Sequence, residues 1–206
     1  MLVDHFRTLA APAELRQKIE RSEFLGLAFP ASGDESFFAS LAQIQKRHFD
    51  ATRHCWAFRL FSGGEGRERS SDAGEPSGTA GKPILSAIAG AELYDAGVVV
   101  VRWYGGVKLG SGGLTRAYRD TSSRLLSSAA LAERYVYERF EVVVPFPMLN
   151  LAYRLVDPPA VVLEGEQYGE TNRFAFDVRL SRAEDFARGL AERRFSFTRD
   201  PTPRLR

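Results

Sequence analysis

The chain has 206 residues, of which 44% are hydrophobic and 26% are charged, and its formal net charge is +2. That length suits one large domain or two small ones, and the composition is ordinary for a globular protein and excludes a polycation. The single cysteine, Cys55, excludes an intramolecular disulfide, and no apolar run approaches the roughly 20 residues that span a bilayer. The first residues resemble neither a signal peptide nor an anchor, so we expect a cytoplasmic protein without a membrane partner.

The region before residue 62 predicts strands around one helix. Glu14–Ile19 alternates imperfectly and fits a strand or a helix, whereas Ser22–Phe29 and Cys55–Phe61 predict strands. A helix is expected between the two strands, because Ser32 and Glu35 have the spacing of a capping box. One face of this helix carries Phe37, Leu41, Ile44 and His48, the last interpreted as a partly buried structural histidine.

The next stretch, residues 62–79, has almost no apolar side chains, so part of it is expected to be an exposed loop. It leads through the block DAGEPSGTAGK, Asp72–Lys82, into a short helix over Pro83–Ala91. Pro83 suits a first helical turn, where its missing N–H costs nothing. A polar, glycine-bearing loop that ends in a lysine is therefore predicted at the N-terminus of this helix.

The central feature of the chain is Val98–Tyr118, with the sequence VVVVRWYGGVKLGSGGLTRAY. Its four consecutive valines predict a strand that is buried on both faces. An amphipathic helix is expected from Leu114 to about Ala130. The glycine-rich turn between them allows two interpretations: a cradle in which backbone N–H groups and the helix N-terminus hold an anion, or a tight turn whose glycines relieve crowding.

The predicted helix over residues 114–130 separates an apolar face from a charged one. From Arg102 to Arg124 the chain carries five basic residues and one acid. Such a local basic patch favours a polyanionic partner, although i,i+4 pairs of arginine and aspartate also suit a solvated surface. The apolar face consists of Leu114, Tyr118, Leu125 and Ala129, and the charged face of Arg116, Arg119, Asp120 and Arg124.

Familiar phosphate-binding motifs fail in this chain. A Walker loop would need glycine at Pro76 and a hydroxyl residue at Pro83. A dinucleotide fingerprint that begins at Gly110 would need its third glycine at Thr115. Neither nucleotide hydrolysis nor nicotinamide chemistry is supported, so no cofactor is assigned. Three scattered histidines and one cysteine also predict no metal site.

Beyond Leu131 the pattern changes to short strands, and we expect a boundary near Ala132–Tyr137 between domains over 1–132 and 137–206. The predicted order in the second half, βαββαβ, is the ferredoxin-like motif, and its charge balance favours a packing or partner module. Its predicted elements are a strand at Phe140–Phe146, a helix over Pro147–Val156, a hairpin of Val161–Tyr168 and Thr171–Leu180 with Phe174, Phe176 and Val178 on one face, a helix capped by Ser181 and Glu184, and a strand at Phe195–Thr198.

Two blocks of the chain resemble a known family. DAGEPSGTAGKPIL (Asp72–Leu85) and Val98–Tyr118 closely resemble the two signature blocks of the IMPACT/YigZ family, and Ser22–Gly26 and Ala51–Arg59 resemble its weaker segments. The resemblance covers about residues 14–130. It implies an α+β fold of two domains. The N-terminal domain would be like the second domain of small-subunit ribosomal protein five and the fourth domain of elongation factor G. The ferredoxin-like C-terminal domain would be like the last domain of that factor.

The chain also departs from the family pattern at three places. Arg53-His54 stands where members usually have histidine-asparagine, Ala73 where a second aspartate is usual, and Glu23 where a basic residue is usual. The glycine-lysine core of both blocks is intact. These departures weaken a catalytic role at the altered positions.

The favoured hypothesis is a translation-associated protein that binds RNA or the ribosome through its basic, glycine-rich face. The family resemblance supports it, because eukaryotic members regulate translation during amino-acid starvation. They carry an extra N-terminal domain, for which this chain has no room, so their partner is not carried over. Trp103 and Tyr104 suit base stacking, although a tryptophan at a strand end is more often in the core. The predicted binding residues are Ser77, Gly78, Thr79, Lys82, Arg102, Gly105, Gly106, Lys108, Gly110, Ser111, Gly112, Gly113 and Arg116.

The alternative hypothesis is an enzyme that acts on a small phosphorylated or anionic substrate. Asp72 and Glu75 would be its acid/base groups, with His54 or Cys55 nearby. Against it, both carboxylates occupy positions that commonly cap helices, and a cysteine within a strand is usually buried and inert. Binding is therefore preferred over catalysis, and no catalytic residue is assigned.

Overall fold

The computed structural model describes residues 4–61 and 66–205, which form two compact units. One unit spans Phe6–Glu133, and the other combines Asp4 and His5 with residues 134–205. The division falls inside strand β7 (Leu131–Val144), which runs through the region where the sequence suggests a domain boundary. No helix within the described ranges is long and apolar enough to cross a membrane.

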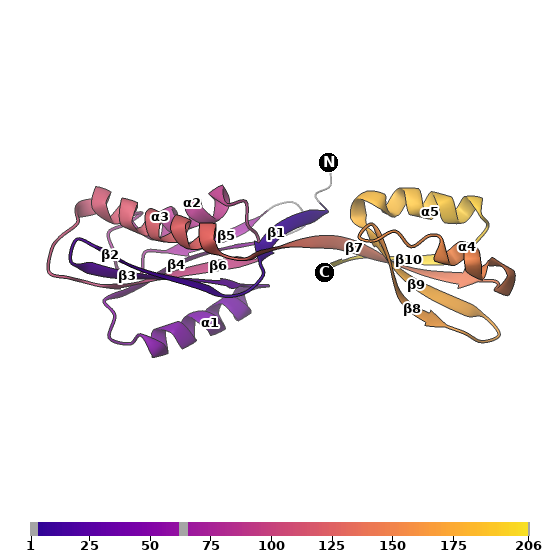
Figure 1. Ribbon diagram of the computed structural model, residues 1–206, viewed down its shortest axis with the longest axis horizontal. Coiled ribbons are helices and arrows are strands. Elements are labelled where there is room, and N and C mark those ends of the chain that lie inside the picture. The colour runs from indigo at the N-terminus through magenta and orange to yellow at the C-terminus, as the bar shows by residue number, and fades with distance from the viewer. Residues whose placement is uncertain (1–3, 62–65, 206) are drawn as a thin grey trace. The chain divides into compact units, whose positions relative to one another are not determined.

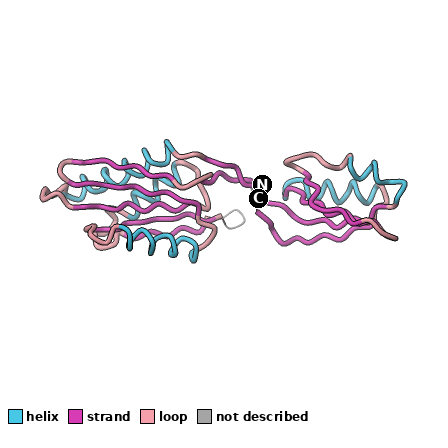
Figure 2. The backbone as a smooth tube through the Cα atoms, turned by 60° about the horizontal axis from the view of Figure 1, so that its bottom comes forward, coloured by secondary structure: helices cyan, strands magenta, loops and turns pink. Residues whose placement is uncertain are grey.

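The first unit is a sheet with helices on both faces (Figures 1 and 2). Its elements are β2 (Ala13–Ile19), β3 (Ser22–Pro30), α1 (Asp34–Arg47), β4 (Arg53–Leu60), β5 (Arg67–Ser71), α2 (Gly81–Gly90), β6 (Ala96–Trp103) and α3 (Gly110–Ser128). Within the described residues the strand order is β2-β3-β6-β4-β5, with every neighbouring pair antiparallel. Helix α1 covers one face, and α2 and α3 cover the other (Figure 1).

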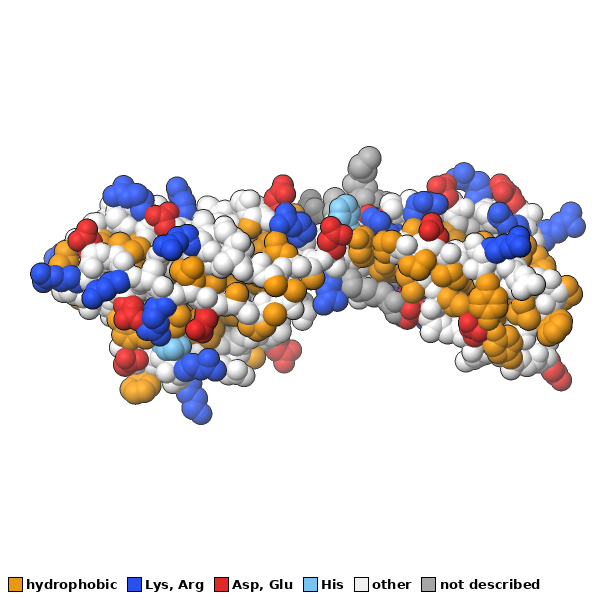
Figure 3. All heavy atoms as spheres, viewed as in Figure 1, with side chains coloured by type: hydrophobic (Ala, Val, Ile, Leu, Met, Phe, Trp, Pro, Cys, Tyr) orange, Lys and Arg blue, Asp and Glu red, His pale blue; other side chains and the backbone are white. Residues whose placement is uncertain are grey.

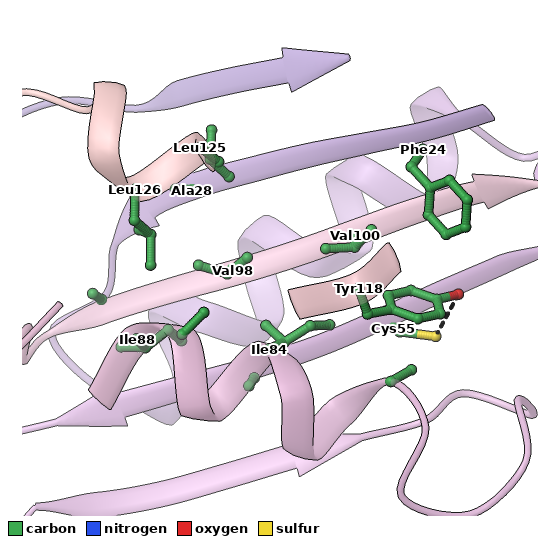
Figure 4. Close-up of a cluster of buried hydrophobic side chains, with 14 of the residues drawn as sticks. Phe24, Ala28, Cys55, Ile84, Ile88, Val98, Val100, Tyr118, Leu125 and Leu126 are labelled. Atoms are coloured by element: carbon green, nitrogen blue, oxygen red, sulfur yellow. Dashed lines mark hydrogen bonds between the residues drawn. The ribbon is translucent and has the colours of Figure 1, made fainter. Parts of the chain in front are cut away.

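Strand β6 is the centre of this sheet, and its valines alternate between two cores. Val98 and Val100 pack with α2 and α3 (Figure 4), whereas Val99 and Val101 pack with the aromatic core under α1. All four side chains are 0% exposed. The prediction of a strand that is buried on both faces is therefore confirmed, since successive strand residues point to opposite faces.

Several predicted boundaries are wrong in this unit. Helix α3 begins at Gly110, four residues before the predicted Leu114, so Gly110, Gly112 and Gly113 belong to its first turns. Glycine is a poor helix former, and the apolar periodicity that marks the helix starts only at Leu114. The predicted capping box of α1 is also absent. Its N-cap is Gly33, whose N–H donates to Ser36 Oγ at 3.1 Å.

The ambiguous segment Glu14–Ile19 lies within strand β2. Strand β5 lies within residues 62–79, part of which is predicted as an exposed loop; residues 62–65 fall outside the described residues. Four of its five residues are exposed, so it forms a sheet edge without apolar side chains. Instead Arg67 and Arg69 form ion pairs with Asp34.

The second unit has the element order βαββαβ and a sheet with strand order β10-β7-β9-β8 within the described residues. Its helices pack on one face, where Phe174, Phe176 and Val178 are buried as predicted. The predicted capping box of the last helix is wrong, because that helix has Arg182 as its N-cap and no side-chain cap. After β7 the elements are η1 (Phe146–Met148), α4 (Leu149–Tyr153), β8 (Val161–Gln167), β9 (Asn172–Arg179), η2 (Leu180–Arg182), α5 (Ala183–Glu192) and β10 (Ser196–Leu205).

Asp4 ties the start of the described chain to this second unit, although the sequence suggests that it belongs to the first domain. Strand β1 (His5–Leu9) runs beside β7, and Val136 N–H donates to the Asp4 carbonyl oxygen at 2.8 Å. The Asp4 side chain accepts hydrogen bonds from Arg179 Nη2 at 2.7 Å and from the Ser181 hydroxyl. Burial alone would raise the pKa of Asp4, but these hydrogen bonds outweigh it and hold the pKa well below its usual value.

We predict that Asp4→Asn destabilises the second unit by about 3 kcal/mol at pH 7, because it leaves the partly buried Arg179 without its counter-charge. A carboxyl whose pKa is depressed on folding stabilises the fold above its unfolded pKa and loses this effect as the pH falls. The difference from the unchanged protein should therefore shrink below about pH 4. Urea unfolding at pH 7 and pH 3 measures it.

The matched control is Asp200→Asn, which removes an ion pair with Arg204 in which both side chains are more than 40% exposed. It should change the unfolding midpoint little. A loss in Asp4→Asn that is equally large at pH 3 would contradict the role assigned to the Asp4 charge.

Candidate functional site

The loop before α2 is organised by Asp72. Its carboxylate accepts hydrogen bonds from the backbone N–H groups of Gly78 at 2.8 Å, Ala80 at 2.9 Å and Gly81 at 2.8 Å. Burial raises the pKa of Asp72, but these N–H groups outweigh it and lower the pKa. Asp72 therefore caps α2 and satisfies N–H groups that a helix N-terminus otherwise leaves free.

Two of the four predicted binding residues of this loop form hydrogen bonds within it. The N–H group of Gly78 binds Asp72, and Thr79 is buried, its hydroxyl donating to the Pro76 carbonyl oxygen at 2.7 Å. Ser77 and Lys82 are exposed. The structure therefore places the protein's own carboxylate where the sequence suggested an external anion.

A buried hydrogen-bonded network links this loop to β6 and α3. Glu75 Oε1 accepts hydrogen bonds from Arg102 Nη1 at 2.6 Å and from the Tyr118 hydroxyl at 2.9 Å. The Cys55 thiol lies 3.3 Å from that hydroxyl (Figure 4). It also lies 3.0 Å from the Asp72 carbonyl oxygen. Burial raises the pKa of Cys55 to about 12, so its thiol is protonated and unreactive at neutral pH.

Arg102 lies at the end of β6 and points to the same face as Val98 and Val100. It is 6% exposed, and Glu75 neutralises its charge. Its Nε atom has no hydrogen-bond partner among the described residues. Trp103 points to the opposite face and packs against the α1 core, with Nε1 donating to Asp50 at 3.0 Å. Trp103 is partly buried by this contact, which agrees with the core interpretation.

A hollow of about 380 Å³ opens beside the N-terminus of α3. Three basic residues line it. Lys108, which is exposed, and Arg102, which is buried, are predicted binding residues. Arg53, at the start of β4, is not among the predicted ones. The N-cap of α3 is Leu109, which supplies no side-chain cap. The full lining is Thr52, Arg53, Glu75, Pro76, Arg102, Tyr104, Lys108, Leu109, Gly110, Ser111 and Leu114.

The remaining predicted residues lie around this hollow without lining it. A Cβ atom at Gly105 would meet the Arg21 carbonyl oxygen at 1.8 Å, so this glycine permits a close approach of two backbones. Gly106, with φ +85°, allows the turn. Gly112 and Gly113 lie in the first turns of α3, where a Cβ atom at Gly112 would be 3.9 Å from Arg116 Nη1. Figure 3 shows Lys and Arg side chains over α3 and at the end of this unit where α3 begins.

Of the residues in the alternative enzyme hypothesis, Cys55 lies close to Asp72 and Glu75, whereas His54 does not. His54 and Cys55 are neighbours in β4 and point to opposite faces of the sheet. The His54 ring lies 3.0 Å from the His48 carbonyl oxygen beside α1, while Asp72 and Glu75 lie on the α2 and α3 side. Burial lowers the pKa of His54. In the described part of the chain, no three His, Cys, Asp or Glu residues group as a metal site.

Arg53 is the functional candidate that the sequence interpretation missed. It stands in the segment Ala51–Arg59 and was noted only as a departure from the family pattern. Its guanidinium lies near Gly74, where a Cβ atom would be 3.2 Å from Nε. Arg53 pairs with Arg102 across strands β4 and β6, so the two residues lie side by side. The N–H of the preceding residue, Thr52, donates to the Arg102 carbonyl oxygen at 2.8 Å.

Comparison with known proteins gives consistent matches. The family model described as the Impact N-terminal domain matches residues 20–126. An IMPACT family member of Haemophilus influenzae is 32% identical over 181 residues, covering 86% of this chain and 86% of that protein. IMPACT family member YigZ of Escherichia coli is 38% identical over 110 residues, or 53% of this chain and 54% of its own length. The crystal structure of a hypothetical protein is 25% identical, covers 95% of this chain and 97% of its own, and has a TM-score of 0.66.

We predict that Asp72→Ala destabilises the first unit by about 2 kcal/mol, the upper end for the loss of a helix cap, because three backbone N–H groups lose their acceptor. Asp72→Asn keeps an acceptor oxygen and should lose less. Urea unfolding measures the free energy, and amide hydrogen exchange at Ala80 and Gly81 should accelerate. Asp120→Ala, on the exposed face of α3, is the control. Unchanged exchange in Asp72→Ala would show that the cap does not hold this loop.

Proposed function

The chain belongs to the IMPACT family, and from this premise we propose that it is a translation-associated protein that binds RNA through the hollow beside α3. RNA or the ribosome would be its partner, and the cytoplasm its place of action. We also propose the finer fold relations. The first unit would correspond to the second domain of ribosomal protein five and the fourth domain of elongation factor G. The second would correspond to the last domain of that factor, which its βαββαβ order supports.

The observation that carries the proposal is that α3 begins at a hollow lined by three basic residues, where its N-cap Leu109 supplies no side-chain cap. A helix of 19 residues presents partial positive charge and free N–H groups at its start, and Gly110 and Ser111 line the hollow there. Arg53 and Lys108 add full charges, while Glu75 offsets only Arg102. A phosphate group fits this combination, and the buried Arg102 Nε still lacks a partner in the described residues.

The basic surface extends beyond the hollow, which favours a polymer over a small anion. Arg116 and Arg119 are exposed on α3, and Arg116 lies beside the first turn of the helix. A line of cations that continues from a phosphate site suits successive phosphates of one backbone. Asp72 and Glu75 already accept hydrogen bonds from protein groups, and His54 lies on the opposite face, so we favour binding over catalysis.

We predict that Lys108→Ala weakens RNA binding by about 1 kcal/mol, or roughly fivefold, because one cation leaves the hollow. For a single strand, the slope of log affinity against log salt concentration should become shallower by about 0.7. Fluorescence titration of a labelled oligoribonucleotide at several salt concentrations measures both quantities. Ribosome co-sedimentation at low and high salt tests the same change on the assembled target.

Two matched lysine variants control this experiment. Lys82→Ala removes an exposed lysine whose charge faces Asp72, and Lys46→Ala removes one from the end of α1. Neither residue lines the hollow, so both should keep the slope of the unchanged protein. Equal losses in all three variants, or binding that does not respond to salt, would contradict the proposed site.

A further inference from the structure

We infer that the hollow receives one unstacked nucleotide, with its base against Tyr104 and its phosphate at the start of α3. This inference rests on the proposed RNA-binding function and names the form of RNA that the site accepts. It concerns a residue, Tyr104, that the charge argument does not use.

Tyr104 is the exposed aromatic side chain of the hollow. It is 45% exposed and follows β6 directly, and its backbone N–H donates to Thr52 Oγ1 at 2.9 Å. The Arg102 guanidinium lies 5.6 Å from the centre of its ring. The ring is therefore held near a buried cation while much of its surface is open. An aromatic face beside a phosphate site is the arrangement with which proteins stack single-stranded bases.

The size of the hollow restricts what can enter. A volume of about 380 Å³ lies near the lower end of the range of roughly 300–1,000 Å³ for small-ligand sites. Such a space suits one nucleotide rather than a helical segment. Bases inside an A-form duplex are stacked and paired, so they do not present a free face to Tyr104. Loops, bulges and ends of RNA do.

The lining also provides separate surroundings for the two parts of a nucleotide. Lys108, Gly110 and Ser111 provide charge and N–H groups suited to phosphate, whereas Tyr104 provides the stacking surface. Arg102 also lines the hollow, and its Nε atom is a donor without a hydrogen-bond partner in the described residues. Base edges present acceptors for such a donor, so the hollow suits an unstacked nucleotide.

The test compares a hairpin RNA whose loop contains 2-aminopurine with a fully paired duplex that contains the same strand, using the full chain. The hairpin should bind at least tenfold more tightly, and binding should quench the 2-aminopurine in its loop. Tyr104→Ala should weaken hairpin binding by about 5- to 150-fold, the range for loss of one stacked base, and abolish the quenching. Its salt slope should stay that of the unchanged protein, and Tyr104→Phe should retain both properties.

The control is Phe49→Ala, which removes an aromatic side chain that is 84% exposed and does not line the hollow. It should bind the hairpin normally. Equal affinity for hairpin and duplex, or normal quenching in Tyr104→Ala, would overturn this inference while the effect of Lys108→Ala upholds the proposed function. If the unchanged protein binds neither RNA in a salt-dependent way, both proposals fail.

Discussion

The geometry around the hollow depends on the buried contact between Glu75 and Arg102. Both side chains are 7% exposed, their atoms are 2.6 Å apart, and Tyr118 adds a third element to the contact. Breaking a buried pair of this kind typically costs about 3–5 kcal/mol, since the remaining charge has no partner. This contact joins the two glycine-rich blocks, because Asp72–Lys82 contributes the carboxylate and Val98–Tyr118 contributes the arginine. The pair also neutralises Arg102, while Arg53 and Lys108 form no ion pair with the residues that the structure describes.

The glycine-bearing loops before α2 and α3 differ in what lies at the N-terminus of the helix. At α2 the loop bends so that Asp72 fills the space in front of the helix, and the anion is the protein's own. At α3 the residue before the helix is Leu109, which leaves the N–H groups of the first turn to the hollow. A sequence pattern of glycine, lysine and helix start cannot distinguish these cases, because the difference lies in one carboxylate six to nine residues upstream. Of these two helix starts, only that of α3 therefore suits an external anion.

The sequence predicted those features of the fold that follow from periodicity. The four valines of β6, the inward face of α3 with Leu114 and Leu125, and the buried Phe174 and Phe176 all follow from alternation or helical spacing. Strand alternation also predicts that Arg102 lies on the same face as Val98 and Val100. It likewise predicts that His54 and Cys55 point to opposite faces. Strand β5 and the start of α3 were not predictable in this way. The first has no apolar residue to show a period, and the second begins with glycines that have no inward side chain.

Residue 53 bears on the kind of site that the hollow is. It is an arginine, which stays protonated at any physiological pH. Arg53 lines the hollow beside Lys108, and neither residue can act as a general base while charged. A guanidinium offers several hydrogen-bond donors to a phosphate. Arg53 therefore suits a hollow that binds an anion.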